Sequence, residues 1–257
     1  MCGYRSSHDT DLAFSERHPE RSAELTERLG VASAGVEEAA SGADVVVVAV
    51  KPQDIAPILA ELKGALRPGT LVISLCAGLP TALFEGGLPD GTPVVRVMPN
   101  TPMLVGEAMS AVSGGAHATA EHLQVAQDML AAVGRVVSVP ESQQDAVTAL
   151  SGSGPAYFFY LVEAMIDAGI LLGLPRAVAA DLIVQSAYGA AVMLRESDDH
   201  PVLLRARGHH DRGHPPARTP RCAGCADRRG RGCSGPIGGA GTHGAAALTR
   251  SADLSSP

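Results

Sequence analysis

The chain has 257 residues, of which 46% are hydrophobic, and this can build one large domain or two smaller ones. The net charge is −7, there is no Trp and aromatic residues make up 3%, so we expect an aliphatic core. No continuous apolar run reaches the roughly 18 residues of a membrane span, and only Cys2 and Cys76 precede residue 205, which excludes a disulfide framework.

The first half of the chain predicts alternating strands and helices. A short strand at Leu12–Arg17 is followed by a helix that begins near Pro19 and stops at Gly30. The β-branched run Asp44–Val50 predicts a strand buried on both faces. Further strands are expected at 70–78, 93–100, 108–112 and 135–140, and helices at 52–66, 80–88 and 120–133. This alternation predicts an α/β fold, a doubly wound parallel sheet.

The region after Glu141 has a different texture. Residues 142–195 show no strand pattern, and Ala, Leu, Met and Val recur at helical spacing. We therefore expect an all-helical second domain that packs on the first domain or on a second chain.

The last part of the chain is unlike the rest. Residues 205–257 contain nine Arg, ten Gly and five Pro but no Val, Phe or Tyr, and they carry a net charge of +6. Such a segment cannot bury enough apolar area to offset its chain entropy, so we expect it to be disordered. The sequence predicts domains at 1–140 and 141–206 and a tail at 207–257.

Three expected strands end in turns whose residues suit the edge of a sheet where a ligand binds. These turns are Ala49–Pro52, Cys76–Gly78 and Met98–Pro102, and the carboxyl ends of parallel strands are where ligands bind. Each turn alone is better explained as an ordinary connection, although Lys51 places a cation where phosphates bind. At Ser15–Arg17, Ser15 and Arg17 favour NADP through a 2′-phosphate, whereas a solvated charged turn is equally consistent.

The stretch LSGSGPAYFFYLVEAM at Leu150–Met165 is the most specific in the chain. A Gly-Ser-Gly-Pro turn interrupts a helix that restarts at Pro155, which offers backbone N–H groups and two hydroxyls to a carboxylate. A packing kink between closely crossing helices is the alternative.

Together, the AVKP, CAG, VVRVMPNTP and SGSGPAY motifs closely resemble pyrroline-5-carboxylate reductase, over about residues 12–205. The resemblance implies a Rossmann-type domain, a helical dimerisation domain and hydride transfer from NADPH, with NADH as the alternative donor, to the C=N bond of 1-pyrroline-5-carboxylate. It also implies self-association through residues 142–195, as dimers and in decamers. We expect a cytoplasmic enzyme with no membrane and no specific nucleic acid partner.

The resemblance assigns site residues one by one. It places three residues at the reaction centre, namely Ser153, Asn100 and Thr101. It places the cofactor on Ser15, Arg17, Ala49, Val50, Lys51, Pro52, Cys76, Ala77 and Gly78. It places the substrate on Glu141, Ser151 and Asp198. No metal site is implied. The protein mainly has to orient the hydride donor and the electrophilic iminium carbon.

Two departures from the family pattern stand out. Residues 1–11 contain neither the first strand nor a G-x-G-x-x-G turn for the pyrophosphate. After HPVLLRA, the chain has RGHHDRGHPP where the family has a loop of the type V-T/S-S-P-G-G-T. We therefore expect this polypeptide to reduce the substrate poorly or not at all.

The codons of Gly208–His214, read one base later, can encode Val-Thr-Thr-Thr-Gly-Gly-Thr, so we interpret the tail from about Arg207 as out-of-frame translation. Resequencing of the DNA tests this. A zinc site on Cys222, Cys225 and Cys233 with His210 or His214 is one alternative, and a basic arm for polyanions is another.

For the whole chain, the alternatives are another imine or hydroxyacid reductase of the same superfamily, a non-catalytic partner subunit and a gene remnant. The first usually requires a catalytic Lys or Asp where this chain has Ser153, Gly154 and Pro155.

Overall fold

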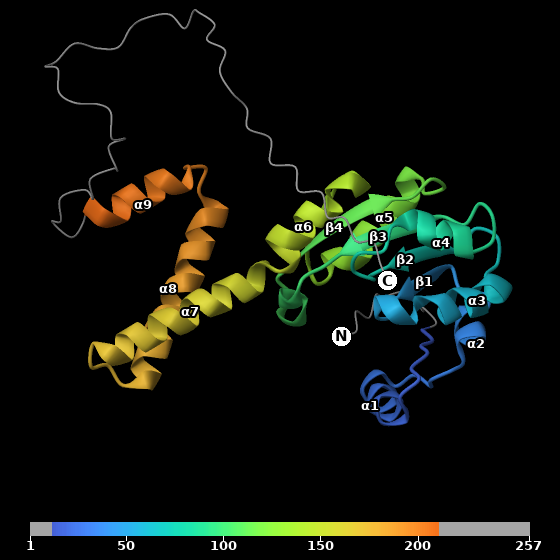
Figure 1. Cartoon of the computed structure of the whole chain (residues 1–257), viewed down its shortest axis with the longest axis horizontal. Coiled ribbons are helices and arrows are strands. Elements are labelled where there is room, and N and C mark those ends of the chain that lie inside the picture. The colour runs from blue at the N-terminus through green and yellow to red at the C-terminus, as the bar shows by residue number, and fades with distance from the viewer. Residues whose placement is uncertain (1–11, 211–257) are drawn as a thin grey trace, which may run out of the picture. The chain divides into compact units, whose positions relative to one another are not determined.

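The computed structural model describes residues 12–210 of the chain. By its internal contacts the chain divides into a compact unit that ends at Val192 and a second that begins at Met193. Figure 1 shows a sheet in the first unit with helices around it, followed along the chain by the long helices. Residues 1–11, where we expect no glycine-rich turn, lie outside the described residues, as do the zinc alternative on Cys222, Cys225 and Cys233 and most of the tail.

The sheet has five strands in the order in which they follow in the chain. The strands are β1 (Val45–Val48), β2 (Leu71–Ser74), β3 (Val94–Met98), β4 (Ala108–Gly114) and β5 (Gly134–Ser138). β1, β2 and β3 run parallel, β4 pairs antiparallel with β3, and β5 runs parallel to β4. These five strands confirm the predicted strand positions from residue 44 onward, and the sheet is parallel as expected except at the β3–β4 pair.

Helices cover both faces of the sheet, which confirms the α/β fold class. The helical elements up to β5 are α1 (Pro19–Leu29), α2 (Val36–Ala40), η1 (Pro52–Asp54), α3 (Ile55–Ala65), α4 (Thr81–Gly87), η2 (Thr101–Val105) and α5 (Ala120–Ala131). α3 and α4 pack with Val72 and Val94 in one buried cluster. α5 packs with Ile73, Val95 and Val112 in another. Successive residues of a strand point to opposite faces, so the two clusters are the two faces of one sheet.

The α1 helix ends as its sequence predicts. Gly30 has the left-handed φ of 69°, and its N–H donates to Thr26 O at 2.9 Å. Glycine takes this conformation without a steric cost, and it is the common stop of a helix.

Two expectations about the first strands are wrong. The predicted strand Leu12–Arg17 is a single bridge between Phe14 and Ser33, because the described residues offer it no longer ladder. β1 is not buried on both faces, since Val47 is 44% exposed. Among the described strands, β1 lies at the edge of the sheet and pairs only with β2. The buried strand residues that pack with α5 belong to β2, β3 and β4.

The second region is helical, as predicted. After β5 the described chain forms η3 (Glu141–Gln143), α6 (Gln144–Val147), η4 (Thr148–Gly152), α7 (Gly154–Leu171), α8 (Arg176–Glu196) and α9 (Pro201–His210). The helical structure does not stop near Arg205, because α9 continues to His210 and its Arg207 pairs with Asp199.

Candidate functional site

Three predicted turns meet at one edge of the sheet. β1, β2 and β3 are parallel, so their carboxyl ends, at Val48, Ser74 and Met98, lie at the same edge. Ala49–Pro52 follows β1 and Cys76–Gly78 follows β2. Most of these residues are exposed, as a ligand-binding edge requires.

Cys76 connects the turn after β2 with the turn after β1. Its side chain is 2% exposed, and its thiol donates to Val50 O at 3.3 Å. Only its backbone can therefore face a ligand. Gly78 follows with a left-handed φ of 75°, and the space where a Cβ would stand is open.

The Ser15–Arg17 segment reaches the turn after β1. Arg17 pairs with Asp54, which ends η1, and the Asp54 N–H donates to Lys51 O at 2.9 Å. Arg17 and Lys51 are both exposed. The structure therefore places two predicted phosphate-binding cations near the carboxyl end of one strand.

Asn100 joins the end of β3 to the helical region. Its Nδ2 donates to Ser151 O at 3.2 Å, and its Oδ1 accepts from the Met109 N–H at 2.9 Å. Both ends of the amide are used, so the side chain is held in one orientation. Asn100 therefore fixes the position of the Ser151 backbone relative to the sheet.

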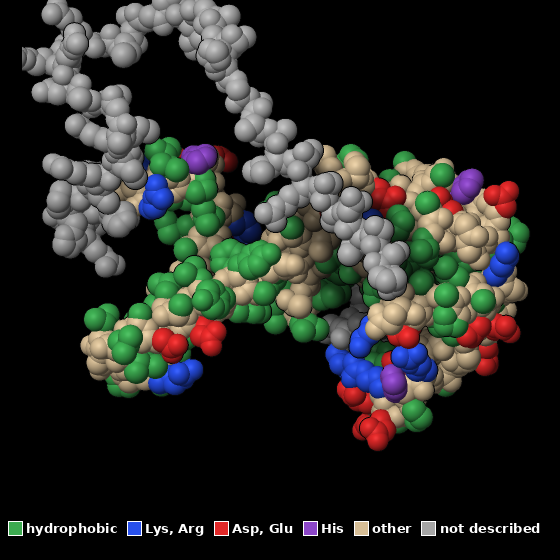
Figure 2. Space-filling view, viewed as in Figure 1, with side chains coloured by type: hydrophobic (Ala, Val, Ile, Leu, Met, Phe, Trp, Pro, Cys, Tyr) green, Lys and Arg blue, Asp and Glu red, His purple; other side chains and the backbone are tan. Residues whose placement is uncertain are grey.

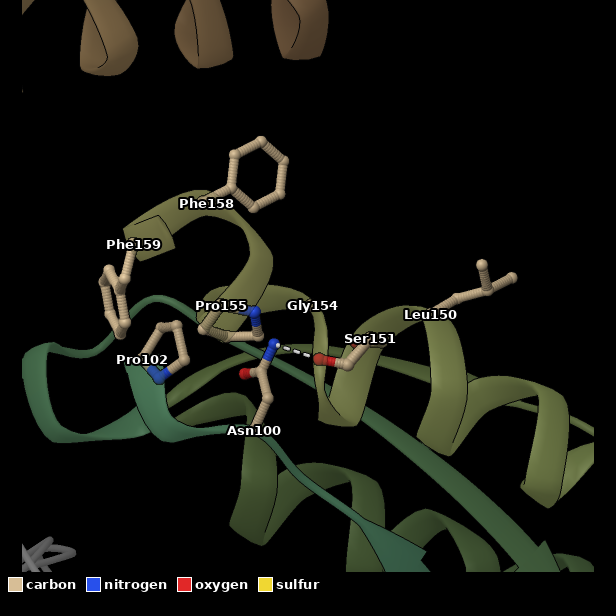
Figure 3. Close-up of a pocket in the computed structure, with 8 residues that line it drawn as sticks. All are labelled: Asn100, Pro102, Leu150, Ser151, Gly154, Pro155, Phe158 and Phe159. Carbon is tan, nitrogen blue, oxygen red and sulfur yellow. Dashed lines mark hydrogen bonds between the residues drawn. The ribbon is translucent and has the colours of Figure 1, made fainter. Parts of the chain in front are cut away.

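A pocket of about 450 Å³ opens beside this hydrogen bond (Figure 3). Its lining comprises Asn100, Pro102, Leu150, Ser151, Gly154, Pro155, Phe158 and Phe159. Figure 3 shows that Asn100 and Pro102 come from the strand end and η2, and the other lining residues from η4 and the start of α7. Two predicted residues, Asn100 and Ser151, thus share an apolar pocket.

The Gly-Ser-Gly-Pro turn has an unusual backbone. Its first residue, Gly152, ends a π-helical turn, η4, and the Ser153 N–H donates to Thr148 O at 2.8 Å. α7 begins at Gly154, one residue before the predicted restart at Pro155. A Cβ at Gly152 would lie 2.5 Å from Met98 Cε, the flexible end of that side chain, so a larger residue there would require Met98 to shift. The half-buried Ser153 side chain makes no capping bond within the described chain.

Two other predicted site residues are not among the residues that line the pocket. Thr101 is exposed at the start of η2. Asp198 is exposed between α8 and α9, in the second unit. Their assignments to the reaction centre and the substrate stay predictions.

Glu141 lies in a polar network on the sheet. Its carboxylate accepts from the Thr81 N–H at 2.7 Å and hydroxyl at 2.8 Å, and it lies 3.3 Å from Arg96 Nη1. Burial alone would raise the pKa of Glu141, but the bonds from Thr81 and Arg96 outweigh it and lower that pKa. Arg96, which is 6% exposed, was missed by sequence reasoning. Its signal is a charged residue inside a buried strand.

The aromatic residues of the pocket lining, Phe158 and Phe159, were not assigned to the site by sequence reasoning. Tyr157, Phe158, Phe159 and Tyr160 are four of the eight aromatic residues of the chain, and each is 60–74% exposed. That concentration is visible in the sequence. Four successive helical residues point to all sides of a helix, so these aromatic side chains are spread around α7 and do not form a single stripe.

Hydrophobic side chains also gather along α7 and α8 (Figure 2). By length and composition alone, the helical run Glu141–Leu171 and α8 could each cross a membrane, a test that core helices of soluble proteins also pass. Among the described residues of α7 and α8, only Gly154 and Ala179 are buried. These helices therefore have large apolar faces open to a partner.

Comparison with protein families gives two matches. Residues 141–214 match the family described as pyrroline-5-carboxylate reductase dimerisation. Residues 5–78 match the family described as NADP oxidoreductase, coenzyme F420-dependent.

Curated relatives agree with these matches. The pyrroline-5-carboxylate reductase of Corynebacterium melassecola is 46% identical over 200 residues, which cover 76% of this chain and 74% of the relative. That of Mycobacterium tuberculosis is 46% identical over 192 residues, covering 72% and 65% respectively. The matched part thus spans about two thirds to three quarters of these relatives.

Solved structures give the same result. The enzyme of that name from Coxiella burnetii has a TM-score of 0.71 and 36% identity, covering 76% of this chain and 74% of its own. Pyrroline carboxylate reductase of Plasmodium falciparum, solved with NADP bound, has a TM-score of 0.65 and 32% identity, covering 69% and 68%.

Proposed function

Because this chain belongs to the pyrroline-5-carboxylate reductase family, we propose that it binds NADPH and 1-pyrroline-5-carboxylate at the carboxyl edge of β1–β3 and forms L-proline. One observation carries the proposal: the Asn100–Ser151 hydrogen bond joins that edge to the Gly-Ser-Gly-Pro turn and forms one side of a pocket. NADH is the alternative donor. The Rossmann-type part at 1–140 and the helical part at 141–206 divide these tasks.

The residues of the edge fit a nicotinamide dinucleotide. Arg17 and Lys51 supply exposed cations for phosphate groups, and Gly78 leaves open space beside the backbone. We assign the adenosine end to Ser15 and Arg17, and the middle of the cofactor to Ala49–Pro52 and Cys76–Gly78. When bound, the cofactor supplies the hydride.

The chain's own residues orient the reactants. Asn100 holds the Ser151 carbonyl in place, and Ser151 and Ser153 offer hydroxyls near the start of α7, where backbone N–H groups suit a carboxylate. Asn100, Thr101 and Ser153 are proposed for the reaction centre. Glu141, Ser151 and Asp198 are proposed for the substrate, although Glu141 contacts Thr81 and Arg96 in this structure.

The family match supports self-association of this chain. We assign it to residues 142–195, where the exposed apolar faces of α7 and α8 lie, and propose a dimer that assembles further into decamers. A partner chain would bury these apolar faces, so they need no membrane to cover them. We place the enzyme in the cytoplasm, with no specific nucleic acid partner.

The reaction is tested by following NADPH oxidation and identifying the product. We expect slow oxidation that depends on 1-pyrroline-5-carboxylate and yields proline, because RGHHDRGH stands in place of the family's substrate loop. Oxidation with 2-keto acids but not with the pyrroline would favour another reductase of the superfamily and contradict the proposal.

The pocket is tested by Asn100→Ala. This variant frees the Ser151 backbone, so we expect kcat/KM for the pyrroline to fall about 10- to 100-fold. Thermal unfolding checks that the variant folds, and Asn100→Asp, which retains the acceptor for Met109 but not the donor, is the matched variant. An unchanged kcat/KM in both variants would show that Asn100 has no role in the reaction.

A further inference from the structure

Arg17 and Asp54 form a two-point ion pair. Arg17 Nη1 donates to Asp54 Oδ1 at 3.1 Å, and Nη2 donates to Oδ2 at 3.2 Å. The two residues are 37 positions apart. A guanidinium and a carboxylate in this fork geometry are strongly directional. The pair therefore holds the Arg17 guanidinium next to the Asp54 carboxylate.

The pair stands at the edge that we assign to the cofactor. Asp54 follows β1 by six residues and is bonded through its backbone to Lys51. The Arg17 side chain is 67% exposed and that of Asp54 is 27% exposed, so both can be reached from solution. Figure 2 shows Lys and Arg side chains gathered beside α1, together with some acidic side chains, and α1 begins two residues after Arg17.

The pair has two opposite effects on a phosphate group: Arg17 attracts it and Asp54 repels it. A guanidinium has five N–H groups, and Asp54 accepts from two of its nitrogens, which leaves further donors for a second anion. The Asp54 carboxylate, however, places negative charge beside that anion and competes for the same cation. Toward an uncharged hydroxyl the carboxylate is an acceptor and not a repelling group.

We propose that Asp54 is a specificity-determining residue that lowers the preference for NADPH over NADH, by engaging Arg17 and by opposing the charge of a 2′-phosphate. The inference rests on the proposed function, because it takes the adenosine end of the cofactor to lie at this edge. Asp54 was not singled out by the sequence, since its partner is distant along the chain.

The test uses the full 257-residue chain and two nucleotides that need neither the nicotinamide nor the pyrroline site. The dissociation constants of 2′,5′-ADP and 5′-AMP are measured by calorimetry at low salt. For Asp54→Asn we expect 2′,5′-ADP to bind about 3- to 10-fold more tightly, with 5′-AMP changed by less than about twofold. For Arg17→Ala we expect the preference for 2′,5′-ADP to disappear.

Asp44→Asn is the matched control. Asp44 also pairs with an arginine, Arg67, but it precedes β1 and so lies at the opposite end of the strand. We expect this variant to leave both dissociation constants unchanged. A thermal melt of each variant confirms folding, and both pairs are exposed enough for the fold to persist.

Weaker or unchanged binding of 2′,5′-ADP by Asp54→Asn would overturn the inference, as would a failure of both wild type and variant to bind either nucleotide. The proposed reaction is judged separately by proline formation. If Asp54→Asn tightens 2′,5′-ADP and no proline forms, the proposed reaction fails and the role of Asp54 stands.

Discussion

Glu141 connects three elements through one carboxylate. It bonds the first residue of α4 through Thr81 and pairs with Arg96 in the middle of β3, while itself beginning η3. Arg96 is almost fully buried, and its other acidic neighbour, Asp145, is 3.8 Å away and 95% exposed. Glu141 is therefore the main counter-charge of a buried guanidinium, at the point where the chain leaves the sheet for the helices.

Replacing Glu141 should destabilise the fold. Glu141→Gln leaves Arg96 buried without its main counter-charge, and we expect a loss of about 2 kcal/mol in the free energy of unfolding. Urea denaturation measures it. Asp145→Asn removes the exposed neighbour and should change the value by less than about 0.5 kcal/mol. Equal effects of the two variants would contradict this assignment.

The same network predicts a dependence of stability on pH. The pKa of Glu141 is lowered in the folded chain, so its contribution is present above its unfolded pKa of about 4.3 and is lost as the pH falls through the folded pKa. We expect wild type to lose unfolding free energy more steeply than Glu141→Gln as the pH drops below about 4.3. Thermal melts of both proteins across this range check the slope, and parallel curves would refute it.

At the scale of elements, β5 depends on a close approach at its first residue. Gly134 has a φ of 151°, and a Cβ there would lie 2.3 Å from Ala108 O and 2.4 Å from Ala108 N. Those atoms belong to the backbone of β4, which cannot move without breaking the parallel β4–β5 ladder. Only glycine fits this register.

We therefore expect Gly134→Ala to cost about 3 kcal/mol or more, because both the backbone strain and the clash must be relieved. Chemical denaturation measures the loss. Gly64→Ala in α3 is the control, since its Cβ would meet nothing within 4 Å and alanine should stabilise the helix by about 0.5–1 kcal/mol. A wild-type stability for Gly134→Ala would show that β5 pairs differently.

For the whole molecule, the long helices raise the question of what covers them. On α8, Leu182 is 52% exposed, Val184 56% and Tyr188 65%. Exposed apolar patches of this kind mark interaction surfaces in soluble proteins. The proposed partner is a second copy of the chain, because the family match over 141–214 is to a dimerisation region.

A charge placed on this surface should prevent association. Leu182→Glu buries an unpaired carboxylate in the proposed interface, and we expect a fall in dimer affinity of about 100-fold or more. Light scattering coupled to size-exclusion chromatography measures the mass. Met129→Glu on α5, at a residue 47% exposed, is the control and should retain the wild-type mass. A dimer that survives Leu182→Glu would exclude this part of α8 from the interface.

Short-range patterns determined much of the fold. The valine runs of β1 and β3, the stop of α1 at Gly30 and the helical spacing after Glu141 are local signals, since the tendency to form a strand or a helix is written in the pattern of neighbouring residues. The strand-end turns at Ala49–Pro52 and Cys76–Gly78 could also be placed at one edge of the sheet, because parallel strands align their carboxyl ends. The family resemblance added the site residues.

Only the tertiary structure decided which distant groups meet. Arg17 reaches Asp54 and Asn100 reaches Ser151, across 37 and 51 positions of the chain. The bridge at Phe14, in place of a full strand, depends equally on what lies beside it. Composition and periodicity carry no information on such pairings, because they arise from packing between elements whose relative positions no short stretch of sequence specifies.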